Sequence, residues 1–168
     1  MILPFSTKIN GKETFFVEKI HKSLREFYFD EHLHLFSFQN DKFNHNFYHR
    51  CIPKLHTIRE DKNDRWKVGT KIDFFINVRQ KNMFRFAPVL PLVSTQKIEI
   101  IYEFENNNRK TRPVVWIYDM VFYDPERRCD KGMLELAKND GFNTIEDFFD
   151  YFDKDYVGKI IHWTGLTY

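Results

Sequence analysis

A short segment in the first half of the chain concentrates the side chains best suited to chemistry. Residues 54–59 read KLHTIR, and the polar members of this stretch are Lys54, His56, Thr57 and Arg59. Ammonium, hydroxyl and guanidinium groups donate hydrogen bonds that suit a phosphate, a carbonyl or the edge of a nucleobase. The alternative is a solvated loop of ordinary charges that precedes an apolar strand.

The path of the backbone decides whether these groups can act together. In an extended chain Lys54 and Thr57 point to opposite faces, because successive side chains alternate. A shared site therefore requires a turn between them. Pro53 makes an irregular start to the segment plausible, since proline fixes its own φ and lacks an N–H.

Charge is distributed unevenly along the chain, although the net charge is only +2. Residues 41–71 hold eight Lys or Arg against four acids, whereas residues 130–155 hold eight acids against three lysines. A basic patch of this kind is what RNA or another anionic partner uses. The candidate ligand-binding residues are Arg50, Lys54, His56, Thr57, Arg59, Arg65, Trp66 and Lys67. For Trp66 we favour a ring packed in the core over one that stacks on a base.

The histidines carry a weaker signal, for a metal. His32 and His34 would share a strand face, and His45 and His49 a helix face. No acid or cysteine completes a recognised zinc spacing with them, so we expect no metal site. Nothing in the sequence indicates a cofactor.

The two cysteines and the hydropathy profile bear on location. Cys51 and Cys129 cannot make a disulfide framework, which favours a reducing compartment. The first residues lack the charged and apolar regions of a secretion signal, and no run of about 18 apolar residues occurs. We therefore expect a cytoplasmic protein without membrane contact, and its oligomeric state is left open.

Hydrophobic periodicity predicts the elements that must position the segment. Apolar residues recur every three or four positions over residues 13–28, which predicts a helix. Strands are predicted over 3–9, 72–78, 94–105, 113–123 and 157–168. The fourth of these is apolar on both faces and should lie centrally. Two short helices are predicted near the end, over 133–139 and from a Thr144 cap with Asp147 in the box position.

The remaining segments and the order of elements set the fold class. Two prolines in residues 86–93 favour an edge strand or a connecting segment over a central strand. Residues 33–36 suggest a short extended segment, and residues 106–112 suggest a polar hairpin loop. There is no repeat or linker. We predict a single α+β domain over residues 1–168, with a mixed sheet or small β-barrel, flanking helices and functional residues on a loop that enters the sheet.

Several motifs together resemble the ASCH domains of the PUA-like superfamily, from phage and bacteria. They are Lys54-x-x-Thr57-Ile58-Arg59, Trp66-x-x-Gly69, residues 15–20, Ser94-x-Gln96-x-Ile98-x-Ile100, Asp140-Gly141-Phe142 and the closing residues 159–164, so the resemblance covers nearly the whole chain. It implies a small mixed or antiparallel β-barrel with flanking helices that binds RNA or nucleotides.

Within that family the chain resembles the bacterial 4-acetylcytidine amidohydrolases, which remove an acetyl group from a modified nucleoside. This implies Thr57 as nucleophile and Lys54 as its activator, since a partly desolvated lysine beside Arg59 has a lowered pKa. It also implies a carboxylate, for which Asp140 or Glu135 is available where the family has a glutamate. Of the wider pattern Gly-x-Lys-x-x-Glu-x-Arg, Ile52 replaces the glycine and Thr57 the glutamate.

Three functions follow as hypotheses. The first is a module that binds RNA or a modified nucleotide in a basic cleft, with cations on phosphate and an aromatic ring on the base. The second is the amidohydrolase, with backbone or Arg59 donors for the oxyanion. The third is an interaction protein whose basic loop only maintains solubility.

Overall fold

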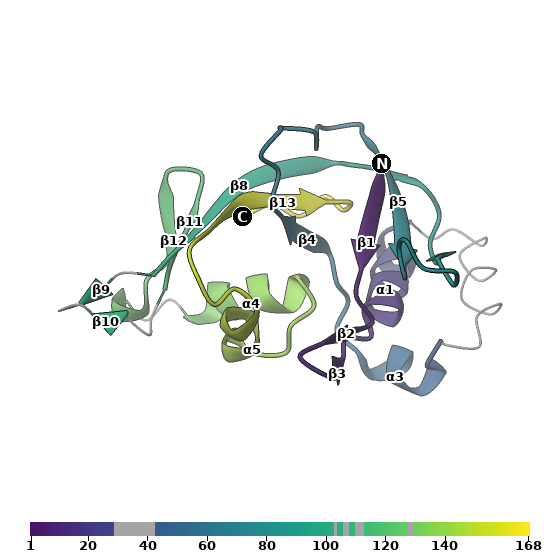
Figure 1. Ribbon diagram of the computed structural model, residues 1–168, viewed down its shortest axis with the longest axis horizontal. Coiled ribbons are helices and arrows are strands. Elements are labelled where there is room, and N and C mark those ends of the chain that lie inside the picture. The colour runs from purple at the N-terminus through teal and green to yellow at the C-terminus, as the bar shows by residue number, and fades with distance from the viewer. Residues whose placement is uncertain (29–42, 103, 106–107, 110–112, 128–129) are drawn as a thin grey trace.

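The computed structural model describes residues 1–28, 43–102, 104–105, 108–109, 113–127 and 130–168. It confirms the α+β class (Figure 1). The extended piece predicted at 33–36, the His32 and His34 pair, Cys129 and most of the 106–112 loop lie outside the described residues.

A five-stranded antiparallel sheet forms the frame of the molecule. Its strands are β4 (His56–Arg59), β8 (Ser94–Ile101), β11 (Val114–Ile117), β12 (Met120–Tyr123) and β13 (Tyr156–His162). Their order is β12-β11-β8-β13-β4, so β4 is an edge strand among those that the structure describes. The long strand β8 arches across the molecule and β4 lies near its middle (Figure 1).

A second sheet lies at one end of this frame. It contains β1 (Ile2–Phe5), β5 (Lys71–Ile76), β6 (Phe84–Arg85) and β7 (Leu90–Pro91), with β1 parallel to β5. Two small hairpins pair β2 (Lys8–Ile9) with β3 (Lys12–Glu13) and β9 (Phe104–Glu105) with β10 (Asn108–Arg109). The pairing of the described strands does not close a barrel.

The helices are α1 (Phe16–Tyr28), α3 (His45–Arg50), the 3-10 turn η1 (Pro125–Arg127), α4 (Asp130–Asn139) and α5 (Ile145–Tyr151). Helix α1 begins later than predicted because Phe15 has φ +52°, which is incompatible with a right-handed helix. The Thr144 cap is confirmed, since its hydroxyl accepts the Asp147 N–H at 3.0 Å. No helix in the described ranges combines the length and the apolar character needed to cross a bilayer.

The prediction of a single central strand over residues 113–123 is wrong. The chain reverses at Tyr118, which has φ +55°, and β11 and β12 form a hairpin with β12 at the sheet edge. A segment that is apolar on both faces fits two short strands as well as one long one, and this turn carries no glycine or proline to mark it.

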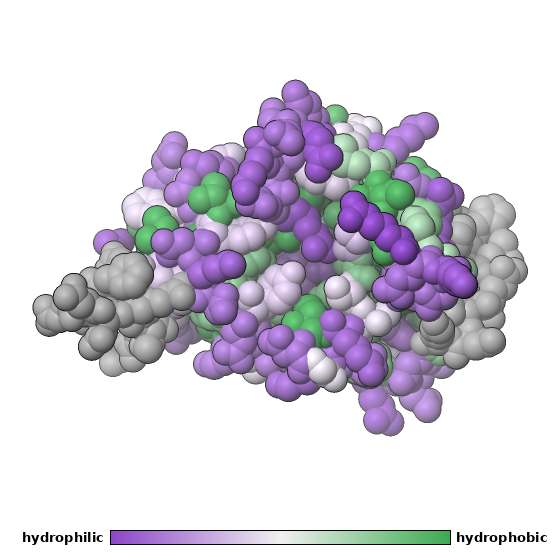
Figure 2. All heavy atoms as spheres, in the orientation of Figure 1, coloured by the Kyte–Doolittle hydropathy of each residue, from purple (hydrophilic) through white to green (hydrophobic). Residues whose placement is uncertain are grey.

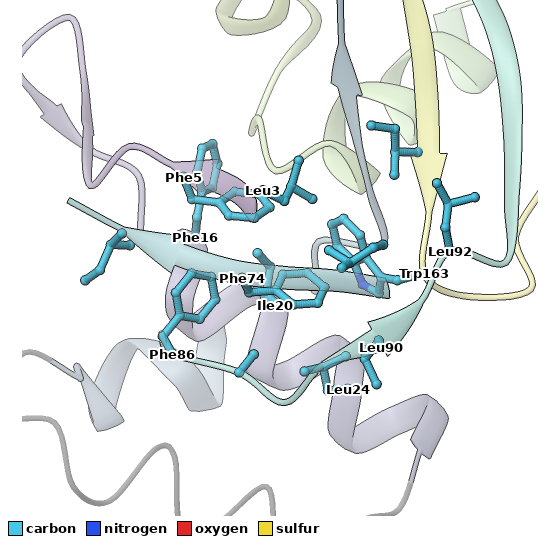
Figure 3. Close-up of a cluster of buried hydrophobic side chains, with 14 of the residues drawn as sticks. Leu3, Phe5, Phe16, Ile20, Leu24, Phe74, Phe86, Leu90, Leu92 and Trp163 are labelled. Atoms are coloured by element: carbon cyan, nitrogen blue, oxygen red, sulfur yellow. The ribbon is translucent and has the colours of Figure 1, made fainter. Parts of the chain in front are cut away.

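Two hydrophobic clusters lie on opposite sides of β13. The first packs α1, β1 and β5 together, with Phe5, Phe16, Phe74, Phe86 and Trp163 in edge-to-face or stacked contact. Figure 3 shows these rings pointing toward one another. The second packs the five-stranded sheet against α4 and α5. Ile161 of β13 belongs to the first cluster and Ile160 to the second, so β4 and β13 lie between the two.

Candidate functional site

A fully buried ion pair lies at the free edge of β4. The Lys54 ammonium, in a residue only 1% exposed, is 2.6 Å from Asp140 Oδ1 and also donates to the Asp140 carbonyl. The same Oδ1 accepts the Ile58 N–H of β4 at 3.2 Å. Asp140 therefore covers the edge of the strand that β13 leaves open.

Burial changes the proton affinity of both partners. Loss of hydration lowers the pKa of Lys54 to about 8, although the neighbouring Asp140 carboxylate opposes the shift. Burial likewise raises the pKa of Asp140, and Lys54 opposes that shift. A lysine in this state can exchange a proton near neutral pH, which an exposed lysine cannot do efficiently.

Helix α1 holds both sides of the pair. The Lys19 ammonium donates to the Gly141 carbonyl at 2.6 Å, and the Lys54 N–H donates to the Lys19 carbonyl at 3.1 Å. Gly141 has φ +94°, and a Cβ there would lie 2.8 Å from the Phe16 ring and 3.1 Å from Lys54 Cδ. The turn after α4 therefore needs glycine both for its backbone and for its closeness to Lys54.

Thr57 and the Lys54 ammonium each approach the first cluster, by different contacts. Thr57 pairs with Ile161, which belongs to the first cluster, and the ammonium is 4.8 Å from the ring centroid of Phe16 in that cluster. Residues 51–55 have no regular structure, which provides the change of direction expected near Pro53. Thr57 is 3% exposed, and its hydroxyl makes no hydrogen bond to any described residue.

Arg59 follows on the same face as Thr57. Its guanidinium lies over the Phe5 ring at 5.4 Å and donates from Nη2 to the Pro4 carbonyl at 2.6 Å. Its Nε is enclosed without a hydrogen-bond partner in the part of the chain that the structure describes. An enclosed N–H without a partner is energetically costly, and a carbonyl oxygen brought within its reach would relieve that cost.

On the opposite face of β4, His56 joins a buried polar network. Its Nε2 is 2.7 Å from the Tyr168 hydroxyl, and its Nδ1 is 3.8 Å from Asp140 Oδ1. The Tyr168 hydroxyl also accepts the Asn139 amide at 2.9 Å. Burial lowers the pKa of His56 well below its ordinary value, and the charges of His162 and Lys54 add to the shift.

Other predicted residues lie apart from the pair. Glu135 is exposed on α4, so Asp140 is the carboxylate that contacts Lys54. Trp66 is 6% exposed in the first cluster, which makes it a core ring and not a surface stacking platform. Arg50 is exposed at the end of α3.

In the loop from β4 to β5, acidic side chains pair with nearby lysines and with backbone N–H groups. Asp61 accepts the N–H groups of Arg65 and Trp66 and pairs with Lys159 at 3.0 Å. The exposed Lys67 pairs with Asp64 at 3.5 Å. Hydrophilic side chains crowd this loop at the top of the face in Figure 2. Because the acids of the loop pair with these lysines, the loop carries less uncompensated positive charge than the sequence implies. Arg65 remains exposed there.

A pocket of about 110 Å³ opens beside the pair. Its walls include Thr14, Phe16, Lys19, Gly141, Phe142 and Asn143. Three of these, Phe16, Lys19 and Gly141, also contact or flank the Lys54–Asp140 pair. Lys19 is a residue that sequence reasoning missed, although its position three residues after Phe16 places a charge on the buried face of α1.

The described residues do not form a metal-binding cluster. Within the described ranges no three His, Cys, Asp or Glu side chains come together as a metal ion requires, and His45 and His49 are exposed on α3. Comparison of the chain with protein families, curated proteins and solved structures finds no match.

Proposed function

We propose that the protein is a PUA-like, ASCH-type amidohydrolase that removes an acyl group from the base of a modified nucleoside such as 4-acetylcytidine. The observation that carries the proposal is the buried Lys54–Asp140 contact next to β4, the strand on which Thr57 faces the cluster that contains Phe16, whose ring lies 4.8 Å from the Lys54 ammonium. A fully buried ammonium held by a carboxylate cannot reach a surface phosphate. It is instead suited to proton transfer with a neighbouring hydroxyl.

The chemistry has two halves. In the first, neutral Lys54 accepts the Thr57 hydroxyl proton while Thr57 Oγ1 bonds to the amide carbonyl carbon. The amide C–N bond breaks, the base nitrogen takes the proton from Lys54, and an acyl-threonine ester remains. In the second, a water molecule loses a proton to Lys54 and attacks the ester, the C–O bond to Thr57 breaks, and that proton returns to Thr57 Oγ1.

Asp140 and Arg59 supply electrostatic support in this scheme. The Asp140 carboxylate holds the Lys54 nitrogen in place and stabilises its charged form after each proton transfer. The unpartnered Arg59 Nε donates to the negative oxygen of the tetrahedral intermediate. The pocket between Phe16 and Phe142 receives part of the substrate.

The test is release of cytidine from 4-acetylcytidine, followed by chromatography. We expect wild type to turn over, and Thr57→Val to lose activity by at least about 100-fold, since it keeps the shape of the side chain but removes the nucleophile. Lys54→Met and Asp140→Asn should lose activity as well. Thr95→Val is the matched control, because Thr95 lies on β8 opposite the other side of Ile161 and should retain activity. Absence of turnover, or unchanged turnover in Thr57→Val, contradicts the proposal.

A second candidate is binding of RNA or a nucleotide without turnover. It is favoured by the exposed Arg65 and Lys67 on the loop that follows Arg59 and its unpartnered Nε. Fluorescence anisotropy with a short RNA across a salt series tests it, since phosphate contacts make affinity fall as salt rises. Arg65→Gln should reduce the salt slope. Binding without a salt slope, or no binding at low salt, contradicts a phosphate-contacting surface.

A further inference from the structure

Two buried histidines face each other across β4 and β13 and make different hydrogen bonds. His56 and His162 pair in register, and their ring centroids are 5.3 Å apart. Each has one ring nitrogen within hydrogen-bond distance of a partner, and one, Nδ1, that makes no hydrogen bond to the described residues. A neutral imidazole carries its proton on only one nitrogen, so each ring has a definite tautomer to assign.

The tautomer of His162 follows from Gln96. The Gln96 amide nitrogen donates to the Tyr168 carbonyl at 2.7 Å, and its oxygen accepts the Tyr168 N–H at 2.9 Å. Both contacts fix the orientation of the amide, so the oxygen that lies 3.0 Å from His162 Nε2 is an acceptor. His162 therefore carries its proton on Nε2.

The tautomer of His56 is the opposite. The Tyr168 hydroxyl accepts from the Asn139 amide at 2.9 Å, and among the described residues His56 Nε2, 2.7 Å away, is the acceptor for its own proton. The proton of His56 then lies on Nδ1, 3.8 Å from Asp140 Oδ1. The reverse assignment would set a ring lone pair against the carboxylate, which is electrostatically unfavourable.

We propose that His56 is a positioning residue of the Lys54–Asp140 pair, in which a neutral imidazole, held by Tyr168, presents its Nδ1–H to the Asp140 carboxylate from the face opposite Lys54. Its role in turnover rests on the proposed function, whereas its tautomer does not. When Lys54 becomes a neutral amine, Asp140 loses its ionic partner. The Ile58 N–H and the His56 N–H, 3.8 Å away, then favour the ionised carboxylate and hold its position, in opposition to the burial that raises its pKa.

The structural half is tested by two-bond ¹H–¹⁵N correlation spectra of the full chain labelled with ¹⁵N-histidine. At neutral pH we expect the Nδ1–H form for His56 and the Nε2–H form for His162. Tyr168→Phe should remove the single tautomer of His56 and leave that of His162. Tyr151→Phe, on an exposed ring, is the matched control. An Nε2–H form for His56 in wild type overturns the inference, whether or not the protein has activity.

The functional half uses two substitutions that differ in one donor. His56→Asn places an amide N–H near the position of Nδ1, and His56→Leu places none. For cytidine release we expect His56→Asn to keep kcat within a few-fold, and His56→Leu to lower kcat by about 10- to 100-fold with little change in KM. Equal kcat losses in the two variants overturn the positioning role. If His56→Leu does not fold, Tyr168→Phe replaces it, with a kcat loss expected and an unchanged kcat overturning the role.

Discussion

Two regions of the molecule are equally closed to solvent but opposite in chemistry. The first cluster is built from rings and aliphatic side chains, and the Trp163 indole donates to the Ser23 hydroxyl at 3.3 Å. Around β4 and the neighbouring ends of β13 and β8, a second group of buried side chains is instead charged or polar. They are Lys54, His56, Gln96, Asp140 and His162, each no more than 4% exposed.

The contrast indicates what each region is for. Burial of apolar rings stabilises the fold by about 1.5–3 kcal/mol for each side chain, so the first cluster needs no further explanation. Burial of an ion pair is often no better for stability than apolar residues of the same volume. The polar region is therefore better explained by chemistry than by stability.

Separating the buried charges should have the largest effect. Lys54→Met leaves the Asp140 carboxylate uncompensated and should lower the free energy of unfolding by about 3–5 kcal/mol, measured by urea denaturation. Adding Asp140→Asn, which keeps an acceptor for the Ile58 N–H, should restore most of the loss.

A core substitution provides the comparison. Phe74→Ala in the first cluster should also cost about 3–5 kcal/mol, because it leaves a cavity. No neutralising partner exists to restore that loss. If Lys54→Met is tolerated, or if the double variant is no better than the single one, the polar region does not differ from the core in the way that we describe.

Acid should weaken both regions, because buried histidines lie within the polar region and beside the first cluster. His21 contacts the Phe86 carbonyl near the first cluster, and burial lowers the pKa values of His21 and His162 to about 4. The unfolded chain takes up protons below about pH 6.5 and the folded chain does not. Stability is thus fully present above pH 6.5 and falls by about 3 kcal/mol for each histidine between pH 6.5 and 4.

Substitution of either histidine tests the predicted fall in the free energy of unfolding as the pH decreases. His21→Gln and His162→Gln should each flatten the decline in the free energy of unfolding over that interval, with His49→Gln on the exposed surface of α3 as the matched control. Stability that is constant or rises as the pH falls from 6.5 to 4 would show that the rings are accessible to protons in the folded state.

A smaller loss is expected from Gly141→Ala. A methyl group there meets Phe16 and Lys54 in a backbone of φ +94°, so we expect a loss of about 1–3 kcal/mol in the free energy of unfolding and a displaced Lys54. Gly69→Ala separates the two causes, because Gly69 has φ +82° and no atom within 4 Å of the added Cβ. Equal losses in the two variants would mean that crowding near Lys54 contributes nothing.

The smallest effect on stability should come from Thr57→Val. The hydroxyl has no hydrogen bond to the described residues, so its removal should change the free energy of unfolding by less than about 1 kcal/mol. The same substitution should abolish deacylation. A large stability loss, measured by urea denaturation, would assign the hydroxyl a structural role.

Strongly periodic segments were predictable from the sequence. Apolar spacing located α1, alternation located β5 and β8, and the cap at Thr144 located the start of α5. The turn at Tyr118 was not predictable, because Asp119 is its only turn-favouring residue and no glycine or proline accompanies it. The distribution of the described strands between two separate sheets depends on long-range pairing, which local patterns do not encode.

The site was predictable only in part. The motif and its resemblance singled out Lys54, Thr57 and Asp140, but the choice of Asp140 over Glu135 depends on how the end of α4 packs against β4. The prediction that Trp66 packs in the core is confirmed, which removes it from the candidate ligand-binding residues. The hydrogen bond between Tyr168 and His56 was not predictable from local sequence, because the two residues are 112 positions apart.

The pH dependence of cytidine release from 4-acetylcytidine tests the central claim most directly, because the buried Lys54 must be neutral to accept the Thr57 proton. With a Lys54 pKa of about 8, the turnover rate should rise with pH through that value and then level off. Release that is absent, or that shows no rise across this interval, would contradict the assignment of Lys54 as the base.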